Sequence, residues 1–333
     1  MIQVAVTDLE YRKAQKVFTA AANDGLHCLS APPGEDELAA FIRQVGVRYA
    51  VIGVEPYRGP VYDSLPRGGV LARFGVGHDG VDKSLATGRG IICTNTPGAL
   101  DDSVAEHAIN LLLAAARHTV TVAAGVKTGQ WTPIVGRELA DKTLAVIGCG
   151  PIGRRVAQIA AFGLRMKVVG CEVVDVNHEA MEREFGFAHV TKEFAEAVAD
   201  ADFVSLHIPS VTATRYFMNR DRFARMPAKA WLINTARGAI VDERALYEAI
   251  VAGLIAGAAL DVFEREPYVP VDPDKDLRGL KNVIMTPHVG SSTQEACDRM
   301  ARQALANIQA AITGRYDDMN VLNPQVLTAL GGT

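Results

Sequence analysis

The sequence predicts an α/β protein with two doubly wound parallel-sheet domains around a cleft. Two observations carry this prediction. Short apolar segments alternate with helical segments along most of the chain, which is typical of a parallel sheet covered by helices on both faces. One apolar segment, Leu144–Ile147, ends in the pattern G-x-G-x-x-G and is followed by a helical segment. The 333 residues suffice for two domains at the usual size of about 150 residues each.

The composition indicates a globular protein and argues against several other classes. Hydrophobic residues make up 49% and charged residues 22% of the chain, which is ordinary for a globular fold. The net charge of -4 gives no support to a nucleic-acid partner. The apolar run Leu111–Ala116 is too short to span a bilayer, and the N-terminal segment lacks the features of a signal peptide. We therefore expect no membrane association and a cytoplasmic location.

The cysteines indicate a reducing compartment. They are odd in number, scattered, and form no C-x-x-C or Cys/His cluster, so we expect unpaired core thiols and no zinc or other metal site. They are Cys28, Cys93, Cys149, Cys171 and Cys297.

The first hundred residues read as alternating strands and helices without a glycine fingerprint, as expected of a partner domain. The predicted strands are Gln3–Val6, Tyr49–Gly53, Leu71–Gly75 and Ile91–Thr94, and the predicted helices are Arg12–Asn23, Glu35–Val45 and a shorter one from Asp82. A turn-rich connection then places Asp101 or Asp102 to cap a long apolar helix over Ser103–Ala124. The segment 125–141 reads as irregular.

The glycine pattern Gly148-Cys-Gly-Pro151-Ile152-Gly153 begins the second domain. In a strand–turn–helix context, the first glycine permits the tight turn, Gly150 lets a diphosphate approach the backbone, and Gly153 lets the helix pack on the strand. The N-terminus of the helix then offers N–H groups to the phosphates. This context predicts a Rossmann domain that binds a dinucleotide.

A second strand over Met166–Cys171 ends at Glu172, 19 residues after the last glycine of the pattern. An acidic residue about 20 residues on binds the ribose hydroxyls of the adenosine in such domains. No arginine or lysine lies between Val173 and Glu179 to bind a 2′-phosphate. The sequence therefore favours NAD over NADP.

Polar residues follow each predicted strand of the second domain. Because the carboxyl ends of parallel strands share one edge, where ligands bind, we expect these residues to converge. The strands 144–147, 166–171, 203–207, 230–233, 256–260 and 283–286 are followed by Gly148, Glu172, His207-Ile208-Pro209, Asn234–Gly238, Asp261 and Thr286-Pro287-His288.

The chain ends with a helix from about Ser292, where Ser292 and Glu295 make a capping box, to about Thr313. No strand follows this helix, so we expect it to return to the first domain. The predicted domains are therefore a discontinuous substrate-binding domain of residues 1–100 plus 291–333 and an NAD-binding domain of residues 101–290.

Two residues of the strand-end set, together with Glu266 shortly after the strand 256–260, suit the reduction of a ketone by hydride transfer. His288 can donate the proton, Glu266 can orient and charge-stabilise its ring, and Arg237 can bind a carboxylate and polarise the carbonyl oxygen. Taken singly, each residue is equally well explained as a surface or structural residue. Together, beside a dinucleotide pattern, they predict a catalytic cluster.

Several longer segments resemble the signature segments of the NAD-dependent D-isomer-specific 2-hydroxyacid dehydrogenases. These segments are Asn234–Glu243, Gly257–Pro267 and Thr286–Gly290, with N-terminal blocks at Arg73–Asp82, Asn95–Pro97 and Val104–His107. They occur in the family's order and span nearly the whole chain.

The resemblance implies the roles of individual residues. Arg237, Glu266 and His288 match the catalytic residues, and the backbone amides of Val76 and Gly77 match the turn that binds the substrate carboxylate. The cofactor contacts fall on Val104, Gly148, Gly150, Pro151, Ile152, Gly153, Glu172, His207, Pro209, Thr235, Ala236, Asp261, His288 and Gly290. The resemblance also implies two flavodoxin-like domains, a homodimer through the cofactor domains, and the reduction of a small 2-keto acid, of glyoxylate/hydroxypyruvate or D-lactate type, to the D-2-hydroxy acid.

Two positions depart from the family pattern. Val211 stands where a threonine hydroxyl usually faces the cofactor, and Glu172 stands where an aspartate is commoner. Two alternative functions also stay open: an NAD-sensing binding protein of the corepressor kind, and an enzyme like phosphoglycerate dehydrogenase. The short segment after Tyr316 leaves no room for a regulatory domain or partner-binding tail, which favours the small keto-acid enzyme.

Overall fold

The computed structural model describes residues 1–331 and divides them into two compact units. The first unit combines Met1–Leu100 with the segment that starts at Ser291, and the second unit is Asp101–Gly290. Residues 332 and 333, which the predicted first domain included, lie outside the described residues.

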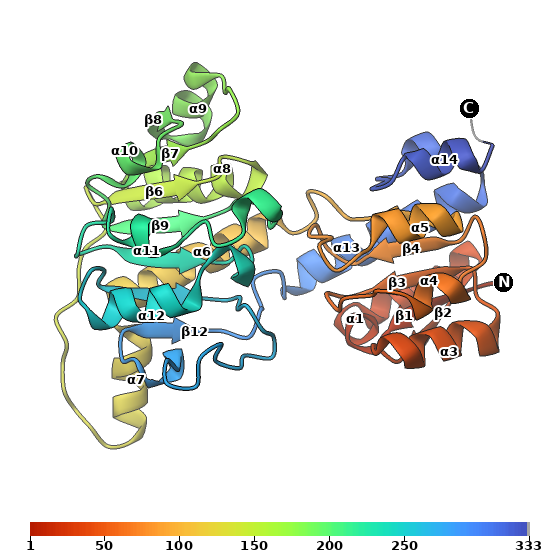
Figure 1. Cartoon of the computed structure of the whole chain (residues 1–333), viewed down its shortest axis with the longest axis horizontal. Coiled ribbons are helices and arrows are strands. Elements are labelled where there is room, and N and C mark those ends of the chain that lie inside the picture. Colours follow the sequence, from red (N-terminus) through yellow and green to blue (C-terminus); the bar gives the residue numbers. More distant parts are fainter. Residues whose placement is uncertain (332–333) are drawn as a thin grey trace. The chain divides into compact units, whose positions relative to one another are not determined.

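The first unit contains a five-stranded parallel sheet in the order β2-β1-β3-β4-β5 (Figure 1). This order is that of flavodoxin-like domains. The strands are β1 (Ile2–Thr7), β2 (Leu26–Ala31), β3 (Tyr49–Ile52), β4 (Val70–Arg73) and β5 (Ile92–Thr94).

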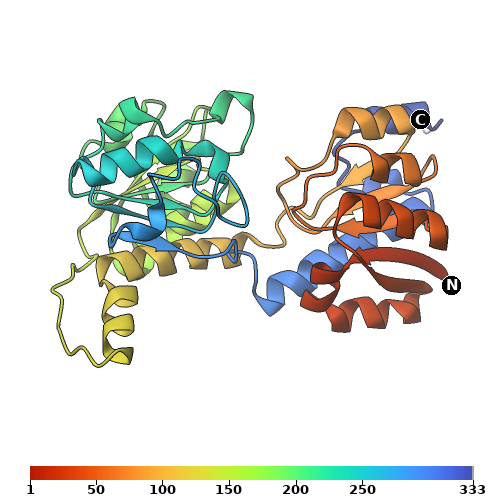
Figure 2. The same cartoon turned by 60° about the horizontal axis from the view of Figure 1, so that its bottom comes forward.

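Helices cover both faces of this sheet (Figures 1 and 2). On one face, Leu38, Ile42 and Tyr62 pack against buried strand residues such as Leu71. On the other face, the long C-terminal helix packs against β4 and against the first two helices. The helices are α1 (Asp8–Lys13), α2 (Gln15–Ala20), α3 (Glu35–Val45), α4 (Pro60–Ser64), α5 (Lys83–Arg89), α13 (Gln294–Ile312) and α14 (Gln325–Ala329).

The predictions for this unit were incomplete. The short helices α4 and α14 were not predicted, and two further differences concern β2 and the first helix. Strand β2 was not predicted, because its outer position leaves His27 exposed and breaks the apolar run. The helix predicted over Arg12–Asn23 starts earlier, at Asp8, and is interrupted at Ala14. Helix α13 does return to the first unit, as predicted.

The predicted capping box at the start of α13 is wrong. The helix begins one residue later than that pattern requires, and the hydroxyl of Thr293 accepts the N–H of Ala296. Ser291-Ser292-Thr293 offers three hydroxyl caps in a row, so the pattern alone does not choose among them.

Two buried asparagines connect the C-terminal segment to the sheet of the first unit. The amide of Asn307 donates to the carbonyl of Asn95 (3.1 Å). Asn323 accepts the N–H of Cys93 (2.9 Å) and donates to the carbonyl of Ile91 (3.0 Å). The C-terminal segment thus satisfies backbone groups of β5 and of the residue before it, so the two ends of the chain form one folded unit.

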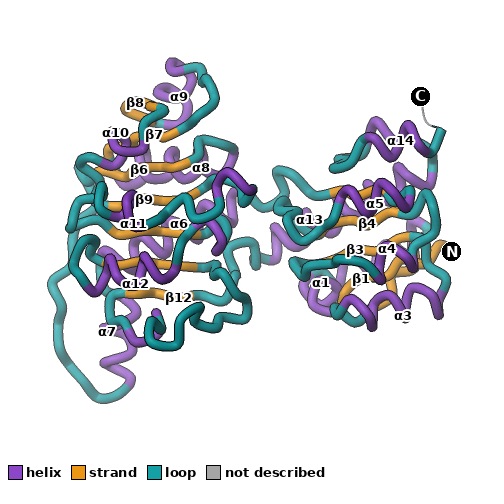
Figure 3. The backbone as a smooth tube through the Cα atoms, viewed as in Figure 1, coloured by secondary structure: helices purple, strands orange, loops and turns teal. Residues whose placement is uncertain are grey.

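The second unit contains a seven-stranded parallel sheet in the order β12-β11-β10-β9-β6-β7-β8 (Figure 3). In chain order this is the 3-2-1-4-5-6 arrangement of dinucleotide-binding domains with one more strand, β12, beyond the sixth. The predicted fold class is thereby confirmed. The strands are β6 (Thr143–Ile147), β7 (Lys167–Cys171), β8 (Phe187–Thr191), β9 (Phe203–Leu206), β10 (Trp231–Asn234), β11 (Gly257–Leu260) and β12 (Val283–Met285).

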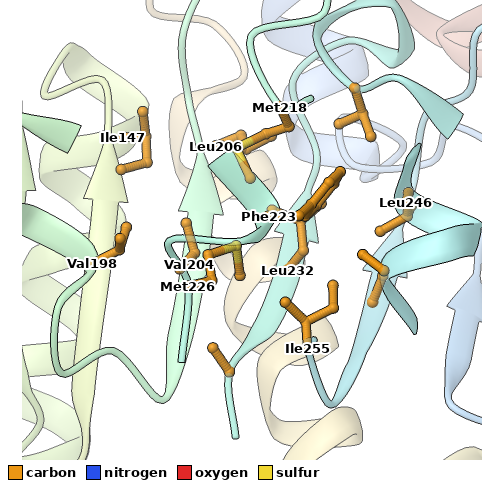
Figure 4. Close-up of a cluster of buried hydrophobic side chains, with 14 of the residues drawn as sticks. Ile147, Val198, Val204, Leu206, Met218, Phe223, Met226, Leu232, Leu246 and Ile255 are labelled. Carbon is orange, nitrogen blue, oxygen red and sulfur yellow. The ribbon is translucent and has the colours of Figure 1, made fainter. Parts of the chain in front are cut away.

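Two apolar clusters form the core of this unit, one on each face of the sheet. Figure 4 shows the cluster in which Leu206 and Leu232 of the sheet meet Phe223 and Leu246 of the covering helices. On the opposite face, Leu111 and Val156 pack over the same sheet. The helices are α6 (Asp101–Ala116), α7 (Thr119–Lys127), α8 (Pro151–Gln158), α9 (His178–Phe185), α10 (Phe194–Val198), α11 (Arg220–Phe223) and α12 (Glu243–Val251).

The long helix predicted over Ser103–Ala124 is two helices, α6 and α7, which differ in direction by 67°. The break includes His118, whose φ of 52° lies in the left-handed region. The predicted cap residues, Asp101 and Asp102, lie inside the first turn of α6. Within residues 1–331, no single helix has the length and apolar character of a membrane span; only this bent pair together meets both criteria.

We predict that Asn323→Ala destabilises the first unit, because the substitution leaves the buried N–H of Cys93 without an acceptor. A buried unpaired backbone group costs about 2 kcal/mol, which lowers the melting temperature of a unit of this size by about 5 °C. Thermal unfolding followed by circular dichroism measures the difference. The exposed Asn23→Ala is the control and should change the melting temperature by no more than about 1 °C. A melting temperature of Asn323→Ala equal to that of the control would contradict the assigned role.

Candidate active site

The polar residues predicted at strand ends lie along one edge of the seven-stranded sheet. Because all its strand pairs are parallel, the carboxyl ends of the strands share this edge. Neighbouring strands bring their residues together in the order of the sheet: Thr286, Asp261, Asn234, His207, Gly148 and Glu172.

The three glycines of the fingerprint differ in their surroundings. Gly148 has a φ of 94°, and a Cβ there would lie 2.7 Å from the carbonyl oxygen of His207. A Cβ on Gly153 would lie 2.0 Å from the carbonyl oxygen of Gly148. A Cβ on Gly150 would meet nothing within 4 Å, and helix α8 begins directly after this residue. The space at Gly150, next to a helix N-terminus, fits the diphosphate of a dinucleotide.

Glu172 lies beside this turn. One carboxylate oxygen accepts the N–H of Cys149 (2.9 Å) and the other accepts the N–H of Val173 (2.8 Å). The carboxylate thus remains at the end of β7, where it can accept hydrogen bonds from ribose hydroxyls. Its negative charge would repel a 2′-phosphate at the same place.

The two cysteines at this turn are not nucleophiles. Burial raises the pKa of Cys149 to about 12 and that of Cys171 to about 11, so both thiols are protonated at neutral pH. All five cysteines are free and buried, as predicted. Residues 1–331 contain no group of three His, Cys, Asp or Glu side chains placed to hold a metal ion.

Asp261 is the most heavily hydrogen-bonded carboxylate of the edge. Its side chain is 1% exposed, and its oxygens accept the N–H groups of Val289 (2.9 Å) and Gly290 (2.8 Å) and the hydroxyl of Thr286 (2.5 Å). His107 of α6 lies 3.3 Å from the same carboxylate. Burial opposes ionisation, but these hydrogen bonds outweigh it and lower the pKa of Asp261 below its ordinary value.

These contacts hold the segment that carries His288. The N–H of His288 donates to the carbonyl of Asp261 (2.8 Å), and its backbone φ of 52° is in the left-handed region, which costs a non-glycine residue about 1 kcal/mol. Val104 of α6 lies beside Gly290, since a Cβ on Gly290 would be 3.7 Å from the Val104 side chain. The bonds to Asp261 on both sides of His288 stabilise this conformation.

His288 and Glu266 form a close pair. Nδ1 of His288 is 2.6 Å from one oxygen of Glu266, and the other oxygen accepts the N–H of Phe263 (2.9 Å). Both side chains are partly exposed, at 26% and 32%. The carboxylate is therefore fixed by its own segment and fixes the imidazole in turn, leaving Nε2 to exchange a proton with a bound molecule.

Arg237 follows β10 in a turn shaped by Asn234. The buried amide of Asn234 accepts the N–H of Ala236 (3.0 Å) and donates to the carbonyl of Arg237 (3.0 Å). A Cβ on Gly238 would lie 1.9 Å from the carbonyl carbon of Phe263, so only glycine permits this approach. The turn that carries Arg237 therefore packs directly on the segment that carries Glu266.

The remaining predicted cofactor residues lie at the ends of β9 and β10. Desolvation lowers the pKa of His207 to about 4, so its ring is neutral, and Nε2 lies 2.8 Å from the hydroxyl of Ser205. The hydroxyl of Thr235 is buried and has no hydrogen-bond partner within residues 1–331. Pro209 and Ala236 are at least partly exposed beside them. An unpaired buried hydroxyl at this edge fits a site that a ligand completes.

The predicted carboxylate-binding turn belongs to the first unit and follows β4. The amide of Asn95 donates to the carbonyl of Val76 (2.8 Å), and the N–H of Thr96 donates to the carbonyl of Gly75 (3.1 Å). The N–H groups of Val76 and Gly77 have no acceptor within residues 1–331. Two adjacent free N–H groups on an anchored turn can bind an anion.

Two residues of this region, His107 and Glu243, had no individual role predicted from the sequence. His107 lies one helical turn after Val104, and this spacing is the only signal that it faces the same edge. Glu243 begins α12 on the same face as Leu246 and Ile250, at positions i, i+3 and i+7. An acidic residue within an apolar helix face is a signal that sequence inspection can detect.

Glu243 is almost fully buried, with 4% of its surface exposed. Burial raises the pKa of its carboxyl to about 7, and the charges of Glu264 and Glu266 act in the same direction. One of its oxygens accepts the N–H of Glu264 (2.7 Å), and the other has no partner within residues 1–331.

This raised pKa predicts a pH-dependent effect of Glu243→Gln on stability. The folded protein retains the proton of Glu243 between pH 4.5 and 7, where the unfolded chain has lost it, so wild-type stability falls as the pH rises through this range. Glutamine cannot ionise. The free energy of unfolding of Glu243→Gln should exceed that of the wild type by little near pH 5 and by at most about 3 kcal/mol near pH 8.

Melting temperatures at the two pH values measure this difference, with Glu248→Gln on the same helix as the matched control. Hydrogen bonds from Lys275 and Arg220 lower the pKa of Glu248, so its replacement should destabilise the protein at pH 8. Identical melting temperatures of Glu243→Gln and wild type at both pH values would show that the buried carboxyl carries no ionisation cost.

Comparisons with known proteins agree with this geometry. Residues 109–290 match the family model described as D-isomer specific 2-hydroxyacid dehydrogenase, NAD binding domain. A glyoxylate reductase from Korarchaeum cryptofilum is 35% identical over 304 residues, which are 89% of this chain and 88% of that protein. A glyoxylate/hydroxypyruvate reductase B from Yersinia pestis is 37% identical over 327 residues, covering 96% of this chain and 95% of that protein.

A solved structure of a 2-hydroxyacid dehydrogenase is similar to this chain over nearly its whole length. D-lactate dehydrogenase from Aquifex aeolicus, complexed with NAD and lactic acid, superimposes with a TM-score of 0.81 at 26% identity and covers 96% of this chain and 99% of that chain. The matched family model spans most of the second unit, including the glycine turn and the strand ends that carry Arg237, Asp261 and His288. The chain therefore belongs to the D-isomer-specific 2-hydroxyacid dehydrogenase family and is an NAD(P)-dependent oxidoreductase of 2-hydroxy and 2-keto acids.

Proposed function

We propose that this enzyme reduces small 2-keto acids, glyoxylate and hydroxypyruvate first among them, to D-2-hydroxy acids with NADH. The observation that carries the proposal is the 2.6 Å pair of His288 and Glu266, with Arg237 on the adjoining turn of the same sheet edge. The curated relatives named glyoxylate reductase and glyoxylate/hydroxypyruvate reductase support the choice of substrate.

The catalytic residues are Arg237, Glu266 and His288. NADH, when bound, supplies the hydride to the carbonyl carbon. His288 donates a proton from Nε2 to the carbonyl oxygen, while Glu266 holds Nδ1 and balances the positive charge of the ring. The planar guanidinium of Arg237 binds the substrate carboxylate and stabilises negative charge on the carbonyl oxygen.

The amide N–H groups of Val76 and Gly77 bind the substrate carboxylate. Their lack of internal acceptors and the anchoring of their turn by Asn95 support this role. A carboxylate bound by backbone N–H groups is held without a side chain that must be ordered first. The substrate is thereby fixed by its carboxylate, the group common to all 2-keto acids.

NAD rather than NADP is the cofactor. The carboxylate of Glu172 at the end of β7 suits the two ribose hydroxyls, and the exposed residues that follow it, Val173 and Val174, carry no positive charge. The space at Gly150 suits the diphosphate, and the unpaired hydroxyl of Thr235 suits a hydrogen bond to the cofactor.

The enzyme is a homodimer that acts in the cytoplasm. Helix α7 has no buried residue, and the segment after it exposes Trp131 (86%) and Val135 (94%). Exposed apolar side chains grouped on one segment favour an interface between two copies of the chain. Five free cysteines favour the reducing cytoplasm.

The first experiment measures NADH oxidation at 340 nm with glyoxylate, hydroxypyruvate, pyruvate and larger 2-keto acids, and repeats the best substrate with NADPH. We expect turnover of glyoxylate or hydroxypyruvate and a preference for NADH. His288→Asn should lower kcat by about 10³-fold and leave the Kd for NADH within about threefold, because only the proton donor is lost.

The exposed His178→Asn is the control for this variant and should retain wild-type kcat. An active His288→Asn enzyme would contradict the role of His288. Absence of turnover across the panel, with NADH still bound tightly, would favour the NAD-sensing alternative.

A second measurement concerns the oligomeric state. Sedimentation or light scattering should give twice the chain mass of 35.6 kDa. The double variant Trp131→Glu/Val135→Glu should shift the protein toward the monomer, because charges are costly in an apolar interface. Val251→Glu, at an exposed valine of α12, is the control and should stay dimeric. A wild-type monomer would contradict the proposal.

A further inference from the structure

The position of Glu266 depends on the short segment 263–266 that carries it. This segment follows β11 and belongs to neither a helix nor a strand, so its backbone N–H groups need partners outside regular structure. The N–H of Phe263 donates to Glu266 itself (2.9 Å). The N–H of Glu264 donates to Glu243 (2.7 Å), which lies on helix α12.

The contact between Glu243 and Glu264 is reciprocal. The N–H of Glu243 donates to a carboxylate oxygen of Glu264 (3.2 Å), and the hydroxyl of Tyr216 donates to the other oxygen (2.7 Å). Two hydrogen bonds in opposite directions thus connect the first residue of α12 to the middle of the segment. We call this pair of bonds the Glu243–Glu264 clasp.

Packing holds the start of the segment, where Phe263 is buried in the core. A Cβ on Gly238 would meet the backbone of Phe263, so the turn after β10 presses on the start of the segment. On another side, Glu264 and Arg265 line a cavity of about 360 Å³. The clasp therefore supplies a constraint that packing does not supply at Glu264.

Neither the helix nor the core needs a carboxyl at position 243. Asp242 caps α12 by accepting the N–H groups of Arg244 and Ala245. The carboxyl of Glu243 forms no ion pair within residues 1–331, and the charged groups that face it from the segment are Glu264, Arg265 and Glu266. A buried acid close to two other carboxylates is unfavourable, so its contribution has to come from the bond to Glu264.

We propose that Glu243 is a positioning residue for the reaction, which holds Glu266 in contact with His288 through the Glu243–Glu264 clasp. The expected effect on kcat rests on the proposed function. The expected effect of Glu243 on the order of the segment 263–266 does not depend on it. Glu243 touches neither Glu266 nor His288 and acts through the backbone of the segment. This role requires only an oxygen at position 243 that accepts the N–H of Glu264, and a neutral carboxyl or an amide provides one equally well.

The test compares Glu243→Gln with Glu243→Met in the full-length protein. The two side chains are similar in length, but only glutamine can accept the N–H of Glu264. Amide hydrogen exchange at Phe263 and Glu264, measured without cofactor, should show at least about tenfold faster exchange at both residues in Glu243→Met. Glu243→Gln should retain wild-type exchange at both, and so should the control Glu248→Met on the same helix.

Kinetics give the second measurement. Glu243→Met should lower kcat for the best keto acid by about tenfold or more and leave the Kd for NADH unchanged, whereas Glu243→Gln should retain wild-type kcat. Should Glu243→Met fail to fold, Tyr216→Phe removes the hydroxyl bound to Glu264 and should shift exchange and kcat in the same direction by a smaller factor.

The two measurements separate this inference from the proposed function. Fast exchange at Glu264 with unchanged exchange at Phe263 and unchanged kcat in Glu243→Met would overturn the positioning role, even in an active enzyme. A wild-type protein without activity toward any keto acid would overturn the proposed function, and the exchange measurement would still decide whether Glu243 orders the segment.

Discussion

The hydrogen bonds to the buried carboxylate of Asp261 are the interactions on which the geometry of the candidate site depends. Placing an ion in a protein interior costs several kcal/mol unless hydrogen bonds compensate. Here the compensation comes from Thr286, Val289 and Gly290, which surround His288 in the sequence, and from His107 on another element. The same bonds that keep the carboxylate charged thus hold the imidazole of His288. Asp261 follows β11, which is paired on both sides, so the sheet itself determines where this imidazole lies.

The sequence predicted the interior strands of both sheets and one edge strand of each, β5 and β12, but missed the other edge strands, β2 and β8. Central strands such as β6 and β10 are wholly buried and read as continuous apolar runs. Strands β2 and β8 are edge strands, and the exposed His27 and His189 interrupt their apolar runs. The break between α6 and α7 is set by the left-handed backbone of His118, which leaves no mark in the apolar periodicity.

The sequence likewise predicted some residues of the candidate site and missed others. Strand ends and glycine spacing located Gly148, Glu172 and His288, because parallel topology places all such residues at one edge. The pairing of Glu266 with His288 spans 22 residues, so no local pattern predicts it. It was predicted from the carboxylate that a proton-donating histidine needs, and the family resemblance implied the same roles. No role was predicted for Glu243, because its contact partner is the backbone N–H group of Glu264. Any residue at position 264 except proline would provide this group, so the sequence carries no sign of the contact.

The discontinuity of the first unit affects the order in which the chain can fold during synthesis. Residues 1–100 leave the ribosome first, but α13, which packs on β4, and Asn323, which pairs with Cys93, come after the whole second unit. The second unit can therefore complete its core before the first. At 5–20 residues per second, the 190 residues from 101 to 290 take roughly 10–40 s to synthesise. Throughout that interval the part of β4 that α13 covers lacks this helix, so its apolar side chains remain exposed on the nascent chain.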